Sequence, residues 1–185
     1  ATVLNNVAST GSTFTLTVNA DTATAHIFDA PIFTATQTGN QIQTLTSVDK
    51  LTGTAATDDV LNAILKATEV TTKPTMSGVE KVNLTAIAAS VFDAANSTGI
   101  TEIGSVDSNN NLTVRNLAAG ATAVVKNTAA GAHTQVQFAN AVAAGTSDVA
   151  TIKVDGVGRG ATAGNTQILN VRGETAGSFE TLNIE

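Results

Sequence analysis

Short runs of alternating apolar and polar residues recur along this chain, and each predicts a β-strand because successive strand side chains point to opposite faces. The most regular run is Met76–Ala86, MSGVEKVNLTA, in which Val82 and Leu84 fall on one face. Beyond residue 86 no helical period persists for more than two turns. The other strands predicted in this way are Thr13–Asn19, Gln41–Val48, Val149–Val154, Gln167–Val171 and Phe179–Ile184.

The run at Met76–Ala86 has an echo 100 positions later, at Ala176–Glu185, AGSFETLNIE. Both copies place a glutamate, Glu80 or Glu180, directly before a strand with the same order of polar and apolar residues. A buried carboxylate needs hydrogen-bond partners. We therefore expect both glutamates to lie at a corner of the fold and to accept hydrogen bonds from backbone N–H groups.

The segment Thr57–Val70, TDDVLNAILKATEV, fits two kinds of structure. Its apolar residues have the spacing of a helix, and Thr57 or Asp58 is a suitable N-cap. The same residues also alternate as they do in a strand that is buried on both faces. The sequence leaves both interpretations open.

Four apolar residues, Ile103, Val114, Val125 and Val136, fall 11 positions apart. Regularly spaced short strands are typical of a parallel β-solenoid, in which each coil stacks on the next, or of an antiparallel β-sandwich. The side chains expected to point inward are those of Val82, Leu84, Ile103, Leu112, Val114, Val125, Val136, Ile152, Val154, Leu169, Val171, Leu182 and Ile184.

Composition favours the parallel β-solenoid over the antiparallel β-sandwich. Aromatic residues make up only 3% of the chain, with no Trp or Tyr, so the interior must consist of small and branched side chains. Such an interior is narrow, as in stacked coils. We expect an N-terminal β region with Asp-rich turns over residues 1–75 and solenoid coils over residues 76–185, continuous with the first part.

The charge of the chain bears on its partners. The net charge is −6, the isoelectric point is near 4.7, and the nine basic residues are scattered singly. Nucleic acid is therefore not an expected partner, because phosphate binding needs a stripe of Lys and Arg. No stretch approaches the roughly 20 apolar residues of a membrane span, so membrane insertion is not expected either. The absence of Cys fits a cytosolic protein or a bacterial surface protein.

Three stretches in this order carry a resemblance to a known family: Thr13–Ala30, TFTLTVNADTATAHIFDA; Ser47–Ile64, SVDKLTGTAATDDVLNAI; and Met76–Ala86. Together they resemble the calcium-dependent S-layer and RTX-like surface proteins of Gram-negative bacteria. The resemblance implies a right-handed parallel β-helix, calcium bound at turns, type I secretion and an extracellular, cell-surface location. It also implies a structural or adhesive protein rather than an enzyme, whose candidate partners are further copies of itself and cell-surface polysaccharide.

Calcium is the cofactor that this resemblance implies, and it prefers oxygen ligands from carboxylates and backbone carbonyls. Asp49, Asp58 and Asp59 bracket a turn of Thr, Gly and Ala whose carbonyls are further candidate ligands, and Asp21 is a second candidate beside Asn19. The alternative is that these residues form turns and solvated caps.

The sequence leaves three hypotheses for function. The first is a self-assembling component of a surface lattice or filament with calcium-stabilised turns. The second is an adhesive or ligand-binding module of a large secreted adhesin. The third is a β-helix enzyme that acts on polysaccharide, with Asp58 and Asp59 as its acid pair, although adjacent strand residues point to opposite faces.

Overall fold

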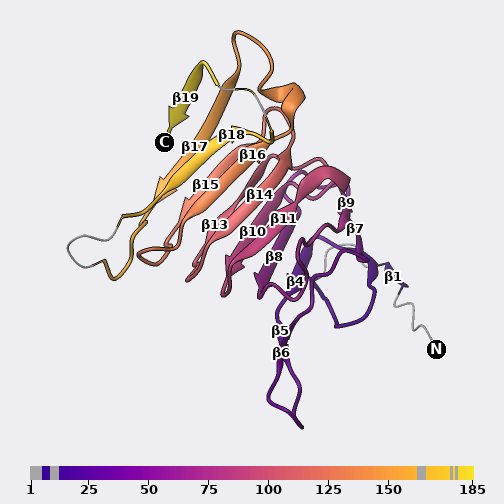
Figure 1. Cartoon of the computed structure of the whole chain (residues 1–185). Coiled ribbons are helices and arrows are strands. Elements are labelled where there is room, and N and C mark those ends of the chain that lie inside the picture. Colours follow the sequence, from indigo (N-terminus) through magenta and orange to yellow (C-terminus); the bar gives the residue numbers. More distant parts are fainter. Residues whose placement is uncertain (1–5, 9–12, 162–165, 176, 178) are drawn as a thin grey trace.

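The computed structural model describes residues 6–8, 13–161, 166–175, 177 and 179–185. Its largest element is an eight-stranded sheet, in the order β19-β17-β15-β13-β10-β8-β4-β2, which runs the length of the molecule (Figure 1). Its strands are β2 (Thr13–Thr15), β4 (Ile27–Ala30), β8 (Val60–Leu65), β10 (Lys81–Ala86), β13 (Glu102–Val106), β15 (Thr122–Lys126), β17 (Val149–Asp155) and β19 (Thr181–Ile184).

Two further sheets are built from the strands between these. The five-stranded sheet contains β1 (Asn6–Ala8), β3 (Thr22–Thr24), β7 (Lys50–Thr52), β9 (Thr75–Ser77) and β12 (Ser97–Thr98). The four-stranded sheet contains β11 (Ser90–Asp93), β14 (Leu112–Leu117), β16 (Thr134–Phe138) and β18 (Leu169–Gly173). The chain passes from sheet to sheet and returns, so strands that are neighbours in a sheet are far apart in sequence.

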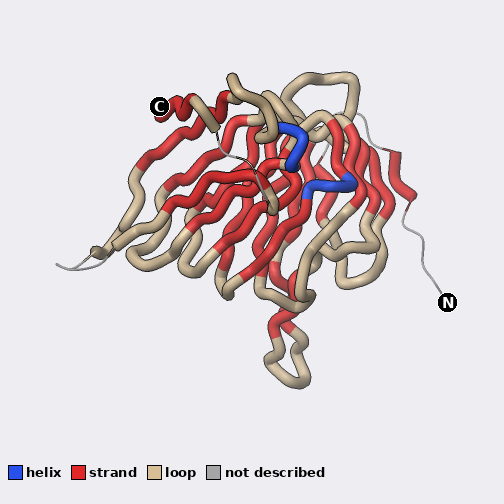
Figure 2. Tube along the Cα trace, turned by 45° about the horizontal axis from the view of Figure 1, so that its top comes forward, coloured by secondary structure: helices blue, strands red, loops and turns tan. Residues whose placement is uncertain are grey.

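Every strand pair in the described part of the chain is parallel, except in one hairpin. This hairpin, β5 (Ile32–Thr34) with β6 (Gln41–Gln43), projects from the body of the molecule (Figure 2). The only helices among the described residues are two short 3₁₀ turns, Ala94–Asn96 and Asn140–Val142. The antiparallel sandwich was therefore the wrong alternative, and the all-β, mostly parallel architecture is compatible with a solenoid.

The strand register defines the repeat of the chain. Lys81 of β10 pairs with Val60 of β8 on one side and with Glu102 of β13 on the other, so each repeat here is 21 residues long (81 − 60 and 102 − 81). Later repeats deviate from this length: Val114 pairs with Val136, 22 residues on, whereas Ile103 pairs with Ala123, not with Val125. The 11-residue spacing is thus about half of one repeat, and residues at this spacing lie alternately in the eight-stranded and the four-stranded sheet.

The core lies between the sheets and consists mainly of aliphatic side chains and three buried phenylalanines. Of the residues predicted to point inward, eight are fully buried: Val82, Leu84, Ile103, Leu112, Val114, Val125, Val136 and Ile152. Val154, Leu169 and Val171 pack against this core while partly exposed. Leu182 and Ile184 of β19 are 48% and 68% exposed, so the prediction of burial is wrong for these two in the structure as described.

Three strand predictions need correction. The run Gln41–Val48 forms a strand only as far as Gln43, and this strand belongs to the antiparallel hairpin. The segment Thr57–Val70 contains a strand rather than a helix, but β8 is buried on one face only, with Leu61, Ala63 and Leu65 inside. The run Thr13–Asn19 forms a strand only as far as Thr15, because the backbone N–H of Thr17 donates to the Asp21 carboxylate and the chain turns there.

The eight-stranded sheet contains strands from both sides of residue 75, and β8 pairs with β10 across this position. Among the described residues, no helix has the length and apolar character that crossing a membrane requires.

Candidate functional site

Acidic residues stand directly before six strands of the structure. Each is followed by any residue, then an apolar residue that points inward, then Thr or Asn. We call these positions the acidic corners; they are Asp21, Asp49, Asp59, Glu80, Asp148 and Glu180. The pattern is readable from the sequence, yet only the likeness of Glu80 and Glu180 had suggested a shared role. Asp148 was missed because its strand carries Ala150 rather than a large apolar residue.

The aspartates of the acidic corners close the loops that precede them. Asp21 accepts the backbone N–H of Thr17 at 2.7 Å, Asp49 that of Thr46 at 2.7 Å, and Asp59 that of Thr54 at 2.6 Å. The hydroxyl of each of these threonines is also bonded to the same carboxylate. Asp148 accepts the backbone N–H of Gly145 at 2.6 Å in the same manner.

The acidic corners also link one repeat to the next. The backbone N–H of Asp21 donates to Asp49 at 2.9 Å, that of Asp59 donates to Glu80 at 2.9 Å, and that of Asp148 donates to Glu180 at 2.8 Å. The prediction that Glu80 and Glu180 share a corner role and accept backbone N–H bonds is therefore confirmed. Ala176 and Ser178, at the start of the echo, lie outside the described residues.

One acidic corner includes a histidine. The Nδ1 atom of His26 lies 2.6 Å from Asp59, which is fully buried, and 3.9 Å from the exposed Asp58. The hydrogen bond to Asp59 raises the pKa of His26, opposed by partial desolvation, and the charges of Asp58, Asp59 and Glu80 raise it further.

Asp49 lies in a different environment, with no exposed surface. Burial raises the pKa of its carboxyl to about 6, although the N–H groups of Asp21 and Thr46 and the hydroxyl of Thr46 oppose the shift.

The calcium candidates do not come together as one site. Asp21 and Asp49 stand at the corner that leads into the five-stranded sheet, whereas Asp58 and Asp59 stand at the corner that leads into the eight-stranded sheet. The carboxylate oxygens of Asp21, Asp49 and Asp59 already accept hydrogen bonds from N–H and O–H groups. The hydrogen atoms of these donors carry partial positive charge and lie where a cation would have to bind. No group of three or more Asp, Glu or His in the described structure is arranged to hold a metal ion. The hydrogen bonds of Asp21, Asp49 and Asp59 therefore count against calcium at these three carboxylates, and calcium binding by the exposed Asp58 stays a prediction.

The suggested acid pair, Asp58 and Asp59, points in two directions. The side chain of Asp58 is 64% exposed, and that of Asp59 is enclosed by Thr54 and His26. Only one of the two carboxylates can therefore reach a substrate in solvent.

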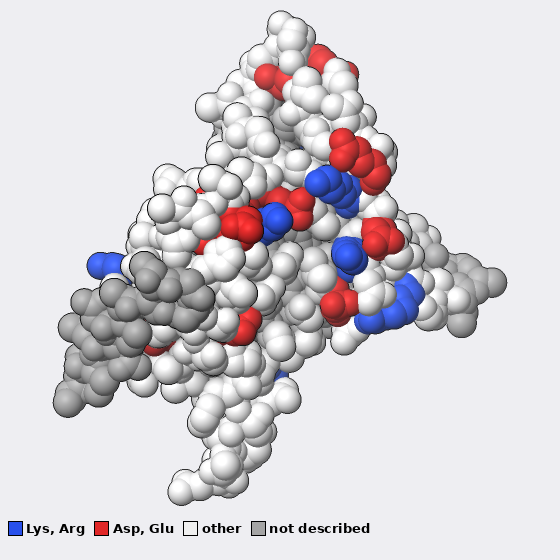
Figure 3. All heavy atoms as spheres, turned by 180° about the vertical axis from the view of Figure 1, so that it is seen from behind, with Lys and Arg blue, Asp and Glu red and all other residues white. Residues whose placement is uncertain are grey.

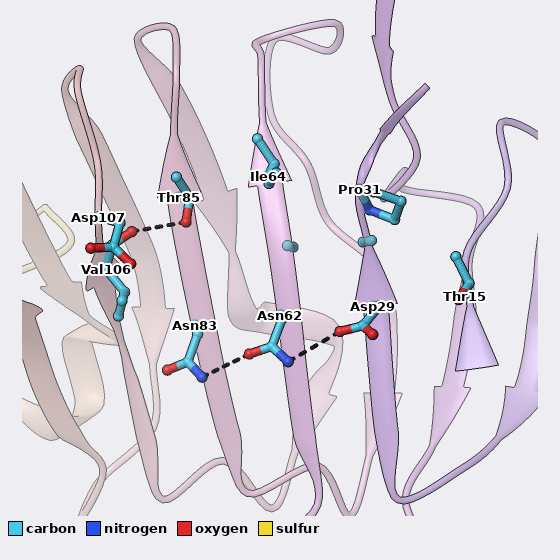
Figure 4. A pocket seen from close by; sticks show the side chains of 11 residues that line it. Thr15, Asp29, Pro31, Asn62, Ile64, Asn83, Thr85, Val106 and Asp107 are labelled. Carbon is cyan, nitrogen blue, oxygen red and sulfur yellow. Dashed lines mark hydrogen bonds between the residues drawn. The ribbon is translucent and has the colours of Figure 1, made fainter. Parts of the chain in front are cut away.

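A groove of about 490 Å³ lies on the outer face of the eight-stranded sheet, across β2, β4, β8, β10 and the end of β13. Asp29, Asn62 and Asn83 lie in a line across three of these strands (Figure 4). The Nδ2 amide of Asn62 donates to Asp29 at 3.2 Å, and that of Asn83 donates to Asn62 at 3.0 Å. Sequence reasoning missed this groove, because the strand register that aligns the three residues depends on loop lengths.

Charged side chains are sparse on the face shown in Figure 3, and acidic and basic groups lie side by side there. Ion pairs among the described residues include Arg115 with Glu174 and Lys73 with Asp93. The surface in that view has no continuous stripe of one sign.

No known protein family, curated protein or solved structure matches this chain.

Proposed function

We propose that this chain is a structural component of a bacterial cell surface, folded as a right-handed parallel β-solenoid whose copies associate head to tail. Right-handed winding is what connections between parallel strands of one sheet almost always adopt. The proposal includes no catalytic step. It also includes no calcium, because the carboxylates of Asp21, Asp49 and Asp59 already accept hydrogen bonds within the protein.

The observation that carries this proposal is the apolar surface exposed at β19. Leu182 and Ile184 occupy the inward positions of this strand, since Leu182 pairs with the buried Ala150 and Ile184 with the buried Ile152. An apolar cavity of about 480 Å³ opens between β17, β18 and β19, and the same two side chains line it. A strand added beside β19 in parallel register buries this surface.

The other edge of the described sheet is β2, and it supplies a complementary strand. One continuous inward row runs from Phe14 through Phe28, Leu61, Val82, Ile103, Ala123 and Ile152 to Ile184. Phe14 of a second copy, placed beside Ile184, continues this row without a change of strand direction. Backbone groups that have no partner at the two edges of the described sheet then become hydrogen-bonded. Because the two edges differ, such contacts are heterologous, and they generate a filament when the rotation between copies does not close a ring.

An adhesive module is the second candidate function. It is favoured by the polar groove on the outer face of the eight-stranded sheet, which stays exposed when copies stack end to end. The resemblance to secreted surface proteins supports the extracellular location in both cases.

Sedimentation velocity over a range of protein concentrations tests the head-to-tail proposal. We expect the wild-type mass to rise with concentration and electron microscopy to show filaments. Ile184→Lys places a charge in the contact, so we expect this variant to remain a single chain. The matched control is Val70→Lys, because Val70 is 94% exposed in a loop away from both edges, and it should assemble like the wild type.

Two results contradict the proposal: a wild-type protein that stays monomeric at every concentration, or an Ile184→Lys variant that assembles as well as the wild type. A circular dichroism spectrum checks that the variant keeps its β structure. Since Ile184 is exposed in the single chain, its replacement should leave the fold intact.

A further inference from the structure

The groove on the outer face of the eight-stranded sheet has two parallel rows of side chains. The strand register places Thr15, Asp29, Asn62 and Asn83 in one row, which is polar. Ile64 and Thr85 pair in the second row, where Pro31 and Val106 also line the groove, so this row is mainly apolar. Both rows run across neighbouring strands (Figure 4).

The polar row is fixed in position before any ligand arrives. Each side-chain amide in the row donates one N–H to its neighbour: Asn62 donates to Asp29, and Asn83 donates to Asn62. In the described structure the second N–H of each amide and the Oδ1 atom of Asn83 have no protein partner. Asn62 is exposed and Asn83 half-exposed, so these groups face solvent in a fixed orientation, which lowers the entropy cost of binding.

The spacing of the polar row selects among extended polymers. Adjacent strands lie about 4.7–4.9 Å apart, so one amide or carboxylate is offered at each such step. A pyranose unit in an extended polysaccharide has nearly this length. An extended peptide advances about 3.3 Å per residue, so its repeat does not match the spacing of the strands. A sugar ring also has apolar C–H faces and hydroxyl edges, which match the apolar and polar rows.

The charge of the groove further limits the class of polysaccharide that it can bind. Asp29 and Asp107 line it, and no Lys or Arg is among its described lining residues. Acidic polysaccharides are therefore repelled. Asp29 remains able to accept hydrogen bonds from sugar hydroxyl groups.

We propose that this groove binds a neutral linear polysaccharide, laid across β2, β4, β8 and β10 with about one sugar unit per strand. The amides of Asn62 and Asn83 bond to its hydroxyl groups, and the apolar row contacts its ring faces. This site does not depend on the head-to-tail association of copies.

The test is an NMR titration of the ¹⁵N-labelled protein with cellohexaose, xylohexaose and mannohexaose, followed through the side-chain amide signals of Asn62 and Asn83. We expect at least one of these sugars to shift both signals. Its affinity should rise roughly tenfold from disaccharide to tetrasaccharide and then level off, because the polar row spans four strands. Polygalacturonate, the acidic comparison, should leave the signals unchanged.

Two variants and a control assign the binding to the groove. Asn62→Leu removes both side-chain hydrogen bonds of the polar row, and Asn83→Leu removes the one between Asn83 and Asn62. Each substitution should weaken sugar binding by roughly fivefold or more. The control is Asn96→Leu, because Asn96 is an exposed asparagine of the 3₁₀ turn Ala94–Asn96, outside the groove, and this variant should bind like the wild type. Both groove positions lie on the solvent side of the sheet, so the fold should persist.

The proposal is overturned if none of the three neutral hexasaccharides shifts the amide signals, if polygalacturonate binds equally well, or if Asn62→Leu binds like the wild type. The Ile184→Lys variant separates this inference from the proposed assembly. Its monomers should bind the sugar with unchanged affinity, whether or not the wild type forms filaments.

Discussion

The buried carboxyl of Asp49 is surrounded by the backbone N–H groups of Asp21 and Thr46 and by the Thr46 hydroxyl. Its pKa of about 6 lies above the usual value of 3.8, so the folded state holds a proton that the unfolded chain releases at lower pH. Between about pH 4 and about pH 6 the folded state therefore binds more protons, and the free energy of unfolding falls as pH rises.

The first prediction is that this fall amounts to on the order of 1–3 kcal/mol and disappears in Asp49→Asn. Urea unfolding of both proteins at several pH values across that window measures it. The comparison concerns the slope with pH, because the substitution also changes one hydrogen bond. Identical slopes for the two proteins would show that the pKa of Asp49 is not raised in the folded state.

His26 adds a pH dependence of the same sign at higher pH. Its pKa is raised by the hydrogen bond to Asp59, so the stabilisation is fully present below the unfolded value of 6.5 and is lost as pH rises through the folded value. We predict that the wild type loses stability between neutral and mildly alkaline pH and that His26→Gln is flatter over this range. Chemical denaturation of both proteins at matched pH values provides the measurement.

Gly53 is a residue at which no side chain fits. A Cβ atom there would overlap the carbonyl oxygen of Gly78 in the next repeat and approach the Asp59 carboxylate. We predict that Gly53→Ala lowers the free energy of unfolding by about 3 kcal/mol or prevents folding. Gly39→Ala is the control: nothing lies within 4 Å, so only its φ of +68° opposes the change, at about 1 kcal/mol. Equal losses in the two variants would contradict this explanation.

At the scale of the element, the acidic corner is a unit that starts a strand and joins it to the strand before. Glu80 and Glu180 perform this role in different surroundings: the bond from Asp59 to Glu80 is partly buried, and the bond from Asp148 to Glu180 is exposed. An unmade bond costs more where water cannot replace it.

We therefore predict that Glu80→Ala destabilises the protein by about 1–3 kcal/mol and Glu180→Ala by less than about 1 kcal/mol. Thermal unfolding of the two variants gives the comparison, and each serves as the control of the other. If Glu180→Ala proved the more damaging, the two corners would not be equivalent elements.

Sequence reasoning identified most elements where apolar residues alternate, as in β10 and β17. It overextended the strand at Thr13–Asn19, because it could not foresee that Asp21 captures the N–H of Thr17. The shared role of Glu80 and Glu180 was predictable because both carry a carboxylate before the same apolar pattern. The alignment of Asn62 with Asp29 was not predictable from the sequence, since 33 residues and a hairpin separate them.

At the scale of the whole molecule, parallel stacking followed from composition and spacing, but the lengths of the repeats did not. The repeat from β10 to β13 is 21 residues, whereas that from β4 to β8 is 33, as Ile27 pairs with Val60. The additional residues form loops and the hairpin, which change the path between sheets and leave the register intact. Register therefore depends on corner bonds rather than on a fixed sequence period.

The stability of the whole molecule should not depend on calcium, because N–H and O–H donors already surround the candidate carboxylates. We predict that EDTA leaves the melting temperature unchanged and that added calcium does not raise it. Differential scanning calorimetry of chelated and calcium-supplemented protein makes the comparison, with magnesium as the control for ionic strength. A rise specific to calcium would place its ligands elsewhere in the chain.

The β5–β6 hairpin leaves the stack after β4 and returns before β7, while β4 still pairs with β8 as if nothing intervened. Its tip is therefore a point where foreign residues can be inserted without disturbing the repeats on either side. In a filament of stacked copies, each such insert would be displayed once per subunit at a regular interval, as an ordered array of epitopes.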